Sequence, residues 1–566
     1  MNNQEIADVL DETARLLELH AANPFKIRSY QSAAFRIDKL SEPLAGKSIG
    51  ELSAIEGIGE SLSQKIHELL ETGKLKEHDE LLAKTPAGVV EMMSIKGIGP
   101  KKVALLWKEL QLESIGELLY ACNENRLIEL KGFGVKTQEL IRRSIEFRQS
   151  QQGLYRYAGA ERSANNLIAW INDRLPGTDL AFTGALRRRC EVVSCIELIA
   201  RAADHMHIVQ TLNHYDRPFL SLGNEEECIK GQTTEGIPVI IHFPKDESRA
   251  YRLWTSTGNE EHLQQCLSQE DQSKINLETC VSELEIYRML GLDYIEPEMR
   301  EGIFEISLAK DKKLPLELID TSDLKGILHN HTTYSDGKNT LREMVLACRD
   351  RGFEYFGVCD HSKSAGYAGG LSIERVRQQQ QEIEELNREL APFRIFSGIE
   401  SDILGDGSLD YPDEVLSSFD FVVASVHSGL RMDQDKAMQR LLKAIANPHT
   451  TILGHPSGRL LLAREGYPLD YSLLIEACSN HGVVIELNAN PYRLDLDWRH
   501  LRQATGAGVL ISINPDAHST DGLDDMYYGT CVARKAGLTA AHIFNAFSRE
   551  EIEKWFSRKK QKTPVK

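Results

Sequence analysis

Through the first 150 residues, apolar side chains recur at helical spacing, which predicts a region that is almost entirely helical. Three segments of this region share one layout: a helix ends, a Gly-hydrophobic-Gly turn follows, and a new amphipathic helix begins. The turns contain three pairs of glycines: Gly57 and Gly59, Gly97 and Gly99, and Gly132 and Gly134. Because the turns are unevenly spaced, they indicate related modules and not a solenoid.

Beyond residue 150 the pattern changes to a mixture of helices and strands. The segment DLAFTGALRRR predicts a strand that enters a glycine turn, and GIPVIIHFP is typical of a β-branched strand. A charged, proline-containing stretch, AKDKKLPLELIDTSD, then predicts a linker before a sharp change of composition at Gly326.

From residue 325 onward, short apolar runs end repeatedly in residues of the types that bind metals. Helical segments such as LREMVLACRDRG and AMQRLLKAIANP separate these runs. Strands that alternate with helices predict a parallel sheet, and seven runs favour a closed (β/α)7 barrel whose strand ends meet at one rim. The residues at the ends of the runs are His329, His331, His361, Glu400, His427, His455, Asn488, Asp516 and His518.

Six histidines from this set, with Asp336, Glu400 and Asp516, make nine candidate metal ligands. Imidazole and carboxylate donors suit Mn²⁺ or Zn²⁺, with Fe as a further option, whereas thiolates would have indicated structural zinc. At about three or four protein ligands per catalytic ion, the set predicts two or three divalent ions. A single histidine after a strand is more often an ordinary core or surface residue, but six in this arrangement favour a metal site.

The composition is ordinary for a globular protein of several domains, with 566 residues, 41% hydrophobic and 27% charged. No apolar run approaches the roughly 20 residues that span a membrane, and the N-terminal segment lacks the order of a signal peptide. Ten cysteines without a CxxC pair indicate neither a disulfide framework nor thiolate zinc, so we expect a cytoplasmic protein. The net charge of −18 disfavours nonspecific adhesion to nucleic acid but is compatible with a local DNA site.

Six motifs of the PHP (polymerase and histidinol phosphatase) family have counterparts in the C-terminal region, in this order: HNHTTYSDG, CDHS, GIES, SVHS, GHPSGR and NPDAH. The resemblance implies one ion among His329, His331, Glu400 and Asp516, a second among Glu400, His427 and His455, and a third among Asp336, His361 and His518. Pro515 departs from the family pattern without removing a ligand. Arg459, Arg464 and Arg493 follow ligand-bearing strands and are candidates to contact substrate phosphates, with surface salt bridges as the alternative.

The Gly-hydrophobic-Gly turns are candidate sites for the DNA backbone, because glycines allow close approach and the next helix presents free N–H groups to a phosphate. Lysines follow two of the turns, at Lys101, Lys102 and Lys136. Glu60 follows the first turn, which is therefore the weakest phosphate site of the three. One such turn often only joins two helices, but three favour DNA binding.

With hairpin modules, a mixed α/β region and a PHP barrel in this order, the whole chain resembles a bacterial family X DNA polymerase. The strings FKIRSYQSAA, TGALRRRCEVV, STGNEEH and DYIEPEMREG extend the match. The resemblance implies an N-terminal lyase-like hairpin domain (1–80), a fingers-like hairpin domain (81–150), a nucleotidyltransferase-like palm (151–235), a palm end and thumb (236–310), a linker (311–323) and the PHP barrel (324–566). It places a lyase lysine, which attacks an abasic sugar as a Schiff base, at Lys65, and a phosphate pocket at Lys26 and Tyr30. A merely solvated Lys65 is the alternative.

The palm departs from the family pattern where catalytic ions would bind. Nucleotidyl transfer needs three carboxylates to hold Mg²⁺ against the triphosphate, but the three positions read Cys195, Glu197 and Ile240. Ala185 stands where a phosphate-binding serine is expected. We therefore predict no polymerase activity, and we interpret residues 187–189 as a basic surface turn with residual DNA contact.

Together these features predict a metal-dependent phosphoesterase that trims DNA 3′ ends, as a 3′–5′ exonuclease in base excision repair would. Bound ions would activate water and stabilise transition-state charge, and His427 is a candidate to protonate the leaving oxygen. The expected partners are DNA ends, gaps or nicks and repair proteins, and we expect a monomer. Two alternatives stay open: a small-molecule phosphatase of the histidinol-phosphate type, and a noncatalytic DNA-end scaffold.

Overall fold

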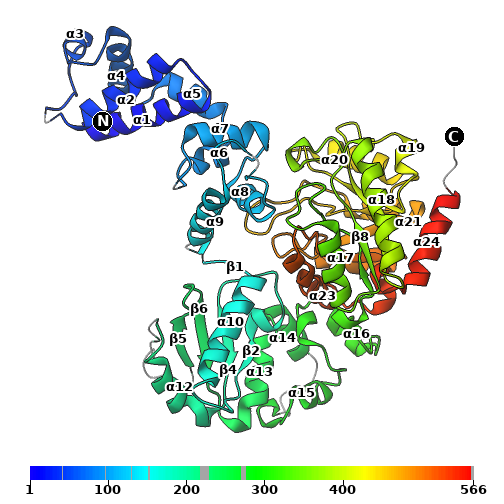
Figure 1. The fold of residues 1–566 in the computed structure, drawn as a ribbon. Helices are drawn as coiled ribbons and strands as arrows, with labels where there is room; N and C mark the ends of the chain where they lie inside the picture. The colour runs from blue at the N-terminus through cyan, green and yellow to red at the C-terminus, as the bar shows by residue number, and fades with distance from the viewer. Residues whose placement is uncertain are drawn as a thin grey trace. The chain divides into compact units, whose positions relative to one another are not determined.

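The structure, a computed structural model, describes residues 1–562 except 41, 96, 129, 151–152, 217–218, 220–227 and 269–275 (Figure 1). The chain divides into two compact units, Met1–Phe147 and Arg148–Lys566. Among the helices that the structure describes, none combines the length and the apolar character that crossing a bilayer requires.

The first unit is helical, as predicted. Its first core is formed by apolar residues at helical spacing on α1, α2 and α4, among them Leu10, Ile37 and Ile66. The helices are α1 (Asn3–Leu19), α2 (Pro24–Asp38), α3 (Ile49–Ser53), α4 (Glu60–Thr72), α5 (Lys76–Ala83), α6 (Ala87–Met92), α7 (Pro100–Glu109), α8 (Ile115–Asn123) and α9 (Val135–Ser150).

The three predicted turns lie between helices of this unit. Their first glycines have φ angles of 85°, 96° and 91°, in the left-handed region that side chains with a Cβ rarely adopt. The second glycines directly precede α4, α7 and α9, and those of α4 and α7 are N-caps without a side-chain hydrogen bond. The backbone therefore forms helix-hairpin-helix turns, and the first N–H groups of α4 and α7 are not capped by a side chain.

The second unit begins with a four-stranded sheet in the order β2-β4-β6-β5, in which only β4 and β6 run parallel. Beside it, two short strands, β1 and β3, pair as a separate antiparallel ribbon. The strands are β1 (Tyr155–Arg156), β2 (Ala181–Thr183), β3 (Val192–Val193), β4 (Ile196–Ile199), β5 (Cys228–Gln232) and β6 (Pro238–His242). The helices of this region and of the segment that follows it are α10 (Tyr157–Asn172), α11 (Gly184–Arg187), α12 (His205–Leu212), α13 (Arg249–Thr257), α14 (Glu260–Leu267), α15 (Glu283–Met289) and α16 (Glu305–Lys310).

The rest of the unit is a seven-stranded parallel sheet in sequence order from β7 to β13, wrapped into a nearly closed barrel with helices outside (Figure 1). Strands β8, β10, β12 and β13 are buried along their whole length, as expected when both faces of a sheet are covered. The strands are β7 (Gly326–Ile327), β8 (Tyr355–Val358), β9 (Arg394–Asp402), β10 (Phe421–Ser425), β11 (Ile452–Leu453), β12 (Val484–Asn488) and β13 (Ile511–Asn514). The helices are α17 (Leu341–Asp350), α18 (Ile373–Glu389), α19 (Asp413–Leu416), α20 (Gln434–Ile445), α21 (Tyr471–His481), α22 (Trp498–Gly506), α23 (Met526–Lys535) and α24 (Arg549–Lys562).

Side chains close the seam between the first and the last strand of the barrel. The amide nitrogen of Asn545 donates to the carbonyls of Gly326 in β7 and Ile513 in β13, at 2.9 and 2.7 Å, and its oxygen accepts from Ile513 N at 2.9 Å. Closure turns the carboxyl ends of all seven strands toward one rim. The predicted (β/α)7 barrel is confirmed.

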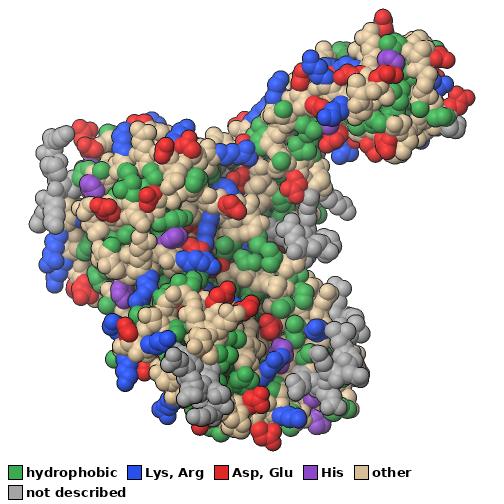
Figure 2. Space-filling view, turned by 180° about the vertical axis from the view of Figure 1, so that it is seen from behind, with side chains coloured by type: hydrophobic (Ala, Val, Ile, Leu, Met, Phe, Trp, Pro, Cys, Tyr) green, Lys and Arg blue, Asp and Glu red, His purple; other side chains and the backbone are tan. Residues whose placement is uncertain are grey.

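The surface shown in Figure 2 carries acidic and basic side chains side by side. Although the net charge is −18, the acidic side chains on this face are interspersed with basic ones and do not form one continuous acidic area there.

We expect Asn545→Ala to destabilise the barrel by about 3 kcal/mol, because it leaves three buried backbone groups without their partner. Urea unfolding followed by tryptophan fluorescence measures the loss. Asn447→Ala is the control, because Asn447 lies in the same barrel but its side chain accepts one hydrogen bond, from His449 N. Equal losses in both variants would show that Asn545 does not close the seam.

Candidate metal centre and phosphate pocket

The nine candidate ligands come together at the carboxyl rim of the barrel. Eight of them lie in a strand or a few residues after one. Asp336 lies farther along the loop that follows β7. No side chain of the nine is more than 7% exposed. Nine buried polar groups at one rim require compensation for their lost hydration, which mutual pairing and bound cations would provide.

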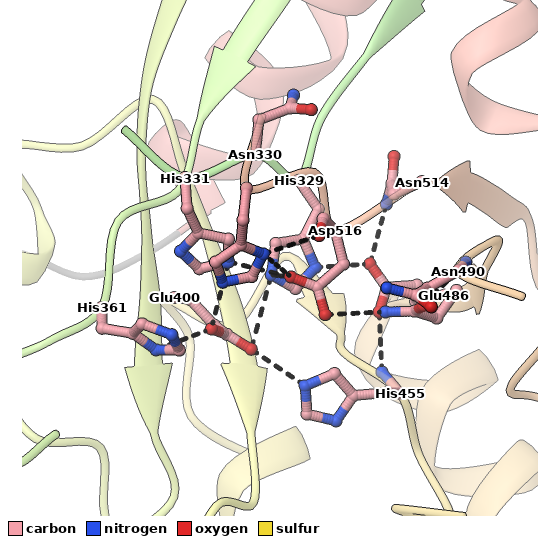
Figure 3. Close-up of polar contacts among 12 residues, drawn as sticks. His329, Asn330, His331, His361, Glu400, His455, Glu486, Asn490, Asn514 and Asp516 are labelled. Carbon is pink, nitrogen blue, oxygen red and sulfur yellow. Dashed lines mark hydrogen bonds and ion pairs between the residues drawn. The ribbon is translucent and has the colours of Figure 1, made fainter. Parts of the chain in front are cut away.

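Glu400 on β9 lies at the centre of this group (Figure 3). Its carboxylate oxygens lie 2.9 Å from His361 Nδ1, 3.0 Å from His455 Nε2 and 3.2 Å from His427 Nε2. The Nε2 atom of His329 is 3.4 Å away. Four imidazoles from four different strand ends therefore face one carboxylate.

Two aspartates extend the cluster on either side. Asp516 Oδ1 lies 2.9 Å from His331 Nε2 and 3.6 Å from His329 Nε2. Asp336 lies 3.3 Å from His518 Nε2 and 3.5 Å from His361 Nε2.

Three overlapping sets of these residues have donor atoms close enough to hold an ion, within 4.8 Å of one another. His331 and His361 each belong to two of the sets, so the groups overlap more than the family resemblance implied. The sets are His331, Asp336, His361 and His518; His329, His331 and Asp516; and His361, Glu400 and His427.

The electrostatics of the cluster suit cations. Burial raises the pKa of Glu400, but the charges of His427, His329 and His361 outweigh it and hold that pKa well below its usual value. Burial, followed by the neighbouring His518 and His361, lowers the pKa of His331 to about 3. His331 is therefore in the neutral state that binds a divalent ion, whereas the carboxylates of Asp336 and Glu400 overcome the effect of burial and raise the pKa of His361 well above its usual value. A divalent ion that binds between His361 and these carboxylates would displace its proton.

Buried donor atoms also fit metal binding. The Nε2 atom of His329 and both ring nitrogens of His361 are buried and face carboxylates, yet they lack the geometry of a hydrogen bond. A cation between these groups would satisfy them, so the residues present fit the ions that the sequence predicted.

Two carboxylates that the sequence did not single out hold the histidines in place. Asp402 accepts a hydrogen bond from His427 Nδ1, and Glu486 accepts one from His329 Nδ1 at 2.7 Å. These contacts turn the Nε2 atoms toward Glu400. Glu486 lies two residues before Asn488, and Asp402 two residues after Glu400, so the two-residue period of a strand gave a signal for both.

The three candidate arginines have different surroundings. Arg493 is buried, with Nε 3.8 Å from Asp516 Oδ2, and therefore lies beside the ligand set. Arg464 donates to the carbonyl of Gly458. Arg459 is held by the carboxylates of Glu191 and Asp497, so the structure does not place it with the ligands.

The lysines of the hairpin turns lie in the first unit. Lys101 is 85% exposed, and Lys136 is also exposed. Lys102 donates to Gly97 O at 3.3 Å and lies 5.3 Å from the centre of the Phe133 ring, so it lies against two of the turns.

The lyase-like pocket contains a residue that the sequence did not predict. Lys26, Tyr30 and Lys65 come together, and all three contact the carboxylate of Glu77 at the start of α5. The Tyr30 hydroxyl donates to Glu77 Oε2 at 2.6 Å. An internal carboxylate thus contacts Lys26 and Tyr30, which the resemblance assigns to a phosphate pocket, and Lys65, which it assigns to the lyase step.

The palm positions lie on neighbouring strands. Glu197 of β4 is in register with Ile240 of β6, while Cys195 precedes β4 and Ala185 lies in α11. Glu197 Oε2 lies 3.3 Å from His242 Nε2. At the three expected metal positions the side chains are thus a thiol, a carboxylate and an alkyl group.

The basic turn of the palm is not a free surface turn, which corrects our expectation. The side chains of residues 187–189 are 20%, 14% and 27% exposed. Their partners are glutamates far along the chain: Arg187 pairs with Glu283, Arg188 with Glu301 and Arg189 with Glu298. The pairing was not visible in the sequence because more than 90 residues separate each arginine from its glutamate.

Three family models match the chain. Residues 1–75 match a helix-hairpin-helix domain, residues 89–146 match a SAM-like helix-hairpin-helix tandem, and residues 328–516 match the PHP domain.

The relatives fall into two kinds. The DNA polymerase/3'-5' exonuclease PolX of Bacillus subtilis is 34% identical over 581 residues, which cover 99% of this chain and 100% of the relative. Probable phosphatases of Caldicellulosiruptor saccharolyticus and Vibrio campbellii are 28% and 29% identical over 34% and 39% of this chain, and over 78% and 88% of their own lengths. The similarity to PolX therefore extends over the full length, whereas these phosphatases match only part of the chain.

We expect Asp402→Asn to weaken Mn²⁺ binding about tenfold, because His427 loses the charged group that orients it. Isothermal titration calorimetry of the full chain measures the affinity. Asp406→Asn is the matched control, because Asp406 lies nearby in the sequence but pairs with Lys443 at the surface. The interpretation fails if both variants bind Mn²⁺ as the parent does.

We expect Glu77→Gln to increase the preference for 5′-phosphorylated over 5′-hydroxyl single-stranded DNA about fivefold, or about 1 kcal/mol, because Lys26 and Lys65 lose a competing carboxylate. Fluorescence anisotropy with the two oligonucleotides measures the preference. Glu80→Gln is the control on the same helix, where Glu80 faces Lys76 at 3.9 Å. An unchanged preference in Glu77→Gln would show that the pocket does not take a phosphate.

Proposed function

The chain belongs to the family X DNA polymerases of the PolX type, and on this basis we propose that it is a metal-dependent phosphoesterase that removes nucleotides from DNA 3′ ends, with a palm that does not polymerise. The observation that carries the proposal is the cluster of nine buried residues with nitrogen and oxygen donors, with Glu400 at its centre. The full-length relative is named as a 3′–5′ exonuclease as well as a DNA polymerase, which supports this polarity.

The residues of the rim would divide the work of hydrolysis. We assign two or three divalent ions, Mn²⁺ or Zn²⁺ with Fe as a further option, to the three overlapping sets, where they would activate water and stabilise charge on the phosphorus in the transition state. Arg493 is the residue that would orient a phosphate, because it is the candidate arginine beside Asp516. Both ring nitrogens of His427 face carboxylates, Glu400 and Asp402, which favours a ligand role for His427 over proton donation.

The helix-hairpin-helix modules support DNA as the substrate. Their turns combine left-handed glycines with uncapped helix starts, an arrangement that binds phosphates of the DNA backbone without reading the bases. DNA ends, gaps and nicks in repair, including base excision repair, are the contexts that we propose, with repair proteins as further partners. We assign the protein to the bacterial cytoplasm as a monomer.

Two features support a palm without polymerase activity. Of the three positions that would hold Mg²⁺, one carries a carboxylate, that of Glu197. The arginines of the α11 turn, which could otherwise neutralise a triphosphate, are each paired with a glutamate. Nucleotide binding would have to break these partly buried pairs.

A small-molecule phosphatase is the second candidate, because the probable phosphatases match about two fifths of the chain or less. A small-molecule phosphatase would not need the hairpin modules. Comparing the turnover of small phosphomonoesters with that of DNA separates the two functions.

The test is digestion of a 3′-end-recessed duplex, labelled at its 5′ end, with Mn²⁺ or Zn²⁺ titrated in and with nucleotides present or absent. We expect a ladder of shortened products and no extension, and we expect His329→Ala combined with His331→Ala to lower the rate at least about 100-fold, since two ligands are lost. The control is His449→Ala combined with His481→Ala, two barrel histidines away from the ligand set.

Each alternative has its own outcome in this experiment. Unchanged digestion by the variant that lacks His329 and His331 would show that the barrel is a noncatalytic scaffold and that a contaminating nuclease formed the products. Templated extension would overturn the proposal for the palm, and faster turnover of phosphomonoesters than of DNA would favour the phosphatase.

A further inference from the structure

The β1–β3 ribbon of the palm faces two loops of the barrel. In the ribbon, Arg156 is in register with Val192, and Tyr157 N donates to Glu191 O at 2.9 Å, so the backbone fixes Glu191 at the ribbon's edge. From this edge the side chains of Glu191 and Arg156 reach barrel residues more than 250 positions away in the sequence.

Glu191 completes the set of acceptors around Arg459. The Arg459 guanidinium donates to Glu191 Oε1 at 2.7 Å and to the carboxylate of Asp497. It also donates to the backbone carbonyls of Arg493, at 3.1 Å, and Leu494. The side chains of Arg459 and Glu191 are 15% and 12% exposed, so solvent screens these contacts little.

The loops that Arg459 joins both carry groups of the candidate metal centre. Arg459 lies four residues after His455 in the loop after β11. Its carbonyl acceptors belong to the loop after β12, where the side chain of Arg493 approaches Asp516. A backbone hydrogen bond from Leu461 N to Tyr492 O, at 2.7 Å, links the same two loops.

Arg156 provides the second contact from the ribbon. Its guanidinium lies 4.0 Å from the centre of the Tyr492 ring, and Tyr492 immediately precedes Arg493. Both side chains of the ribbon therefore act on the short segment that places Arg493 beside the ligand set.

We propose that Glu191 is a positioning residue for the phosphoesterase site: through Arg459 it holds the Arg493 backbone so that the Arg493 side chain meets a substrate phosphate. The palm thus sets the geometry of the barrel's active site although it lacks the carboxylates for its own chemistry. This inference rests on the proposed function, because it assigns Arg493 to the phosphate of that reaction.

Glu191→Gln tests the inference in the full chain. Without the carboxylate, Arg459 retains Asp497 and moves toward it, and the Arg493 segment loses its fixed position. We expect the KM for the recessed DNA to rise about fivefold to tenfold with a smaller change in kcat. We expect a similar loss of affinity for inorganic phosphate, measured by calorimetry on Mn²⁺-loaded protein, with the Mn²⁺ stoichiometry unchanged.

Glu161→Gln is the matched control. Glu161 is also a palm glutamate that bridges to the barrel, accepting from the Tyr527 hydroxyl at 2.7 Å, but Tyr527 lies on α23 and not in either loop. The KM and the phosphate affinity of this variant should stay as in the parent. An equal rise in KM in both variants would show general weakening of the domain contact and would overturn the inference.

Two further variants keep the test decisive. Adding Glu191→Gln to Arg459→Gln should cause no further loss of phosphate affinity, because the glutamate acts through this arginine. If Glu191→Gln does not fold, Arg156→Lys takes its place in the test. This variant keeps the charge but loses the planar stacking on Tyr492, and it should also raise the KM.

The outcomes separate the inference from the proposed function. A parent protein that binds phosphate but degrades no DNA would contradict the proposed function, while a loss of phosphate affinity confined to the Glu191, Arg459 and Arg156 variants would still support positioning. Unchanged KM and phosphate affinity in a folded Glu191→Gln variant would overturn the inference.

Discussion

Seven parallel strands must close for the candidate metal centre to exist, because its donors come from every part of the barrel sequence. The Glu400 carboxylate receives imidazoles from the ends of β7, β8, β10 and β11. In an open sheet these ends would lie along an edge, and only neighbours could meet. The seam closed by Asn545 brings Asp516 and His518, which follow the last strand, next to His331, which follows the first. Closure would therefore be coupled to metal binding, since cations at the rim would offset the cost of burying the charges that closure gathers.

The barrel and its donors could be predicted from the sequence because both leave a local signal. Each apolar run ends next to its ligand, so the topology needed no knowledge of distant contacts. The hairpin turns were readable for the same reason, since a left-handed glycine and a helix start occupy a few consecutive residues. Asp402 and Glu486 were missed although each lies two residues from a residue that the sequence singled out at the end of its strand, because a carboxylate there does not reveal that its partner is a histidine.

Long-range pairing explains the remaining misses. The sequence shows Arg187, Arg188 and Arg189 as a basic turn, but their glutamates come from the thumb region, so an exposed turn was the wrong expectation. Arg459 looks like a phosphate ligand because it follows His455, yet its acceptors include a palm residue 268 positions earlier. Glu77 likewise reaches Lys26 from another helix. A single sequence does not show which charges will meet once the chain has folded.

The ion pairs of Arg187, Arg188 and Arg189 join the α11 turn to glutamates of the region 283–301 within the second unit. A buried pair adds little net stability over apolar packing, but the loss of one partner leaves an unpaired charge and costs about 3–5 kcal/mol. Arg188 and Lys535 share Glu301, and Arg189 and Arg534 share Glu298, so the arginine turn and helix α23 of the barrel depend on the same two carboxylates. Replacing any one of these arginines would therefore disturb the contact between palm and barrel and not only the palm. On this account the basic turn is fixed to helix α23 through the shared carboxylates, while the loops around Arg459 and Arg493 are contacted by Glu191 and Arg156 of the β1–β3 ribbon.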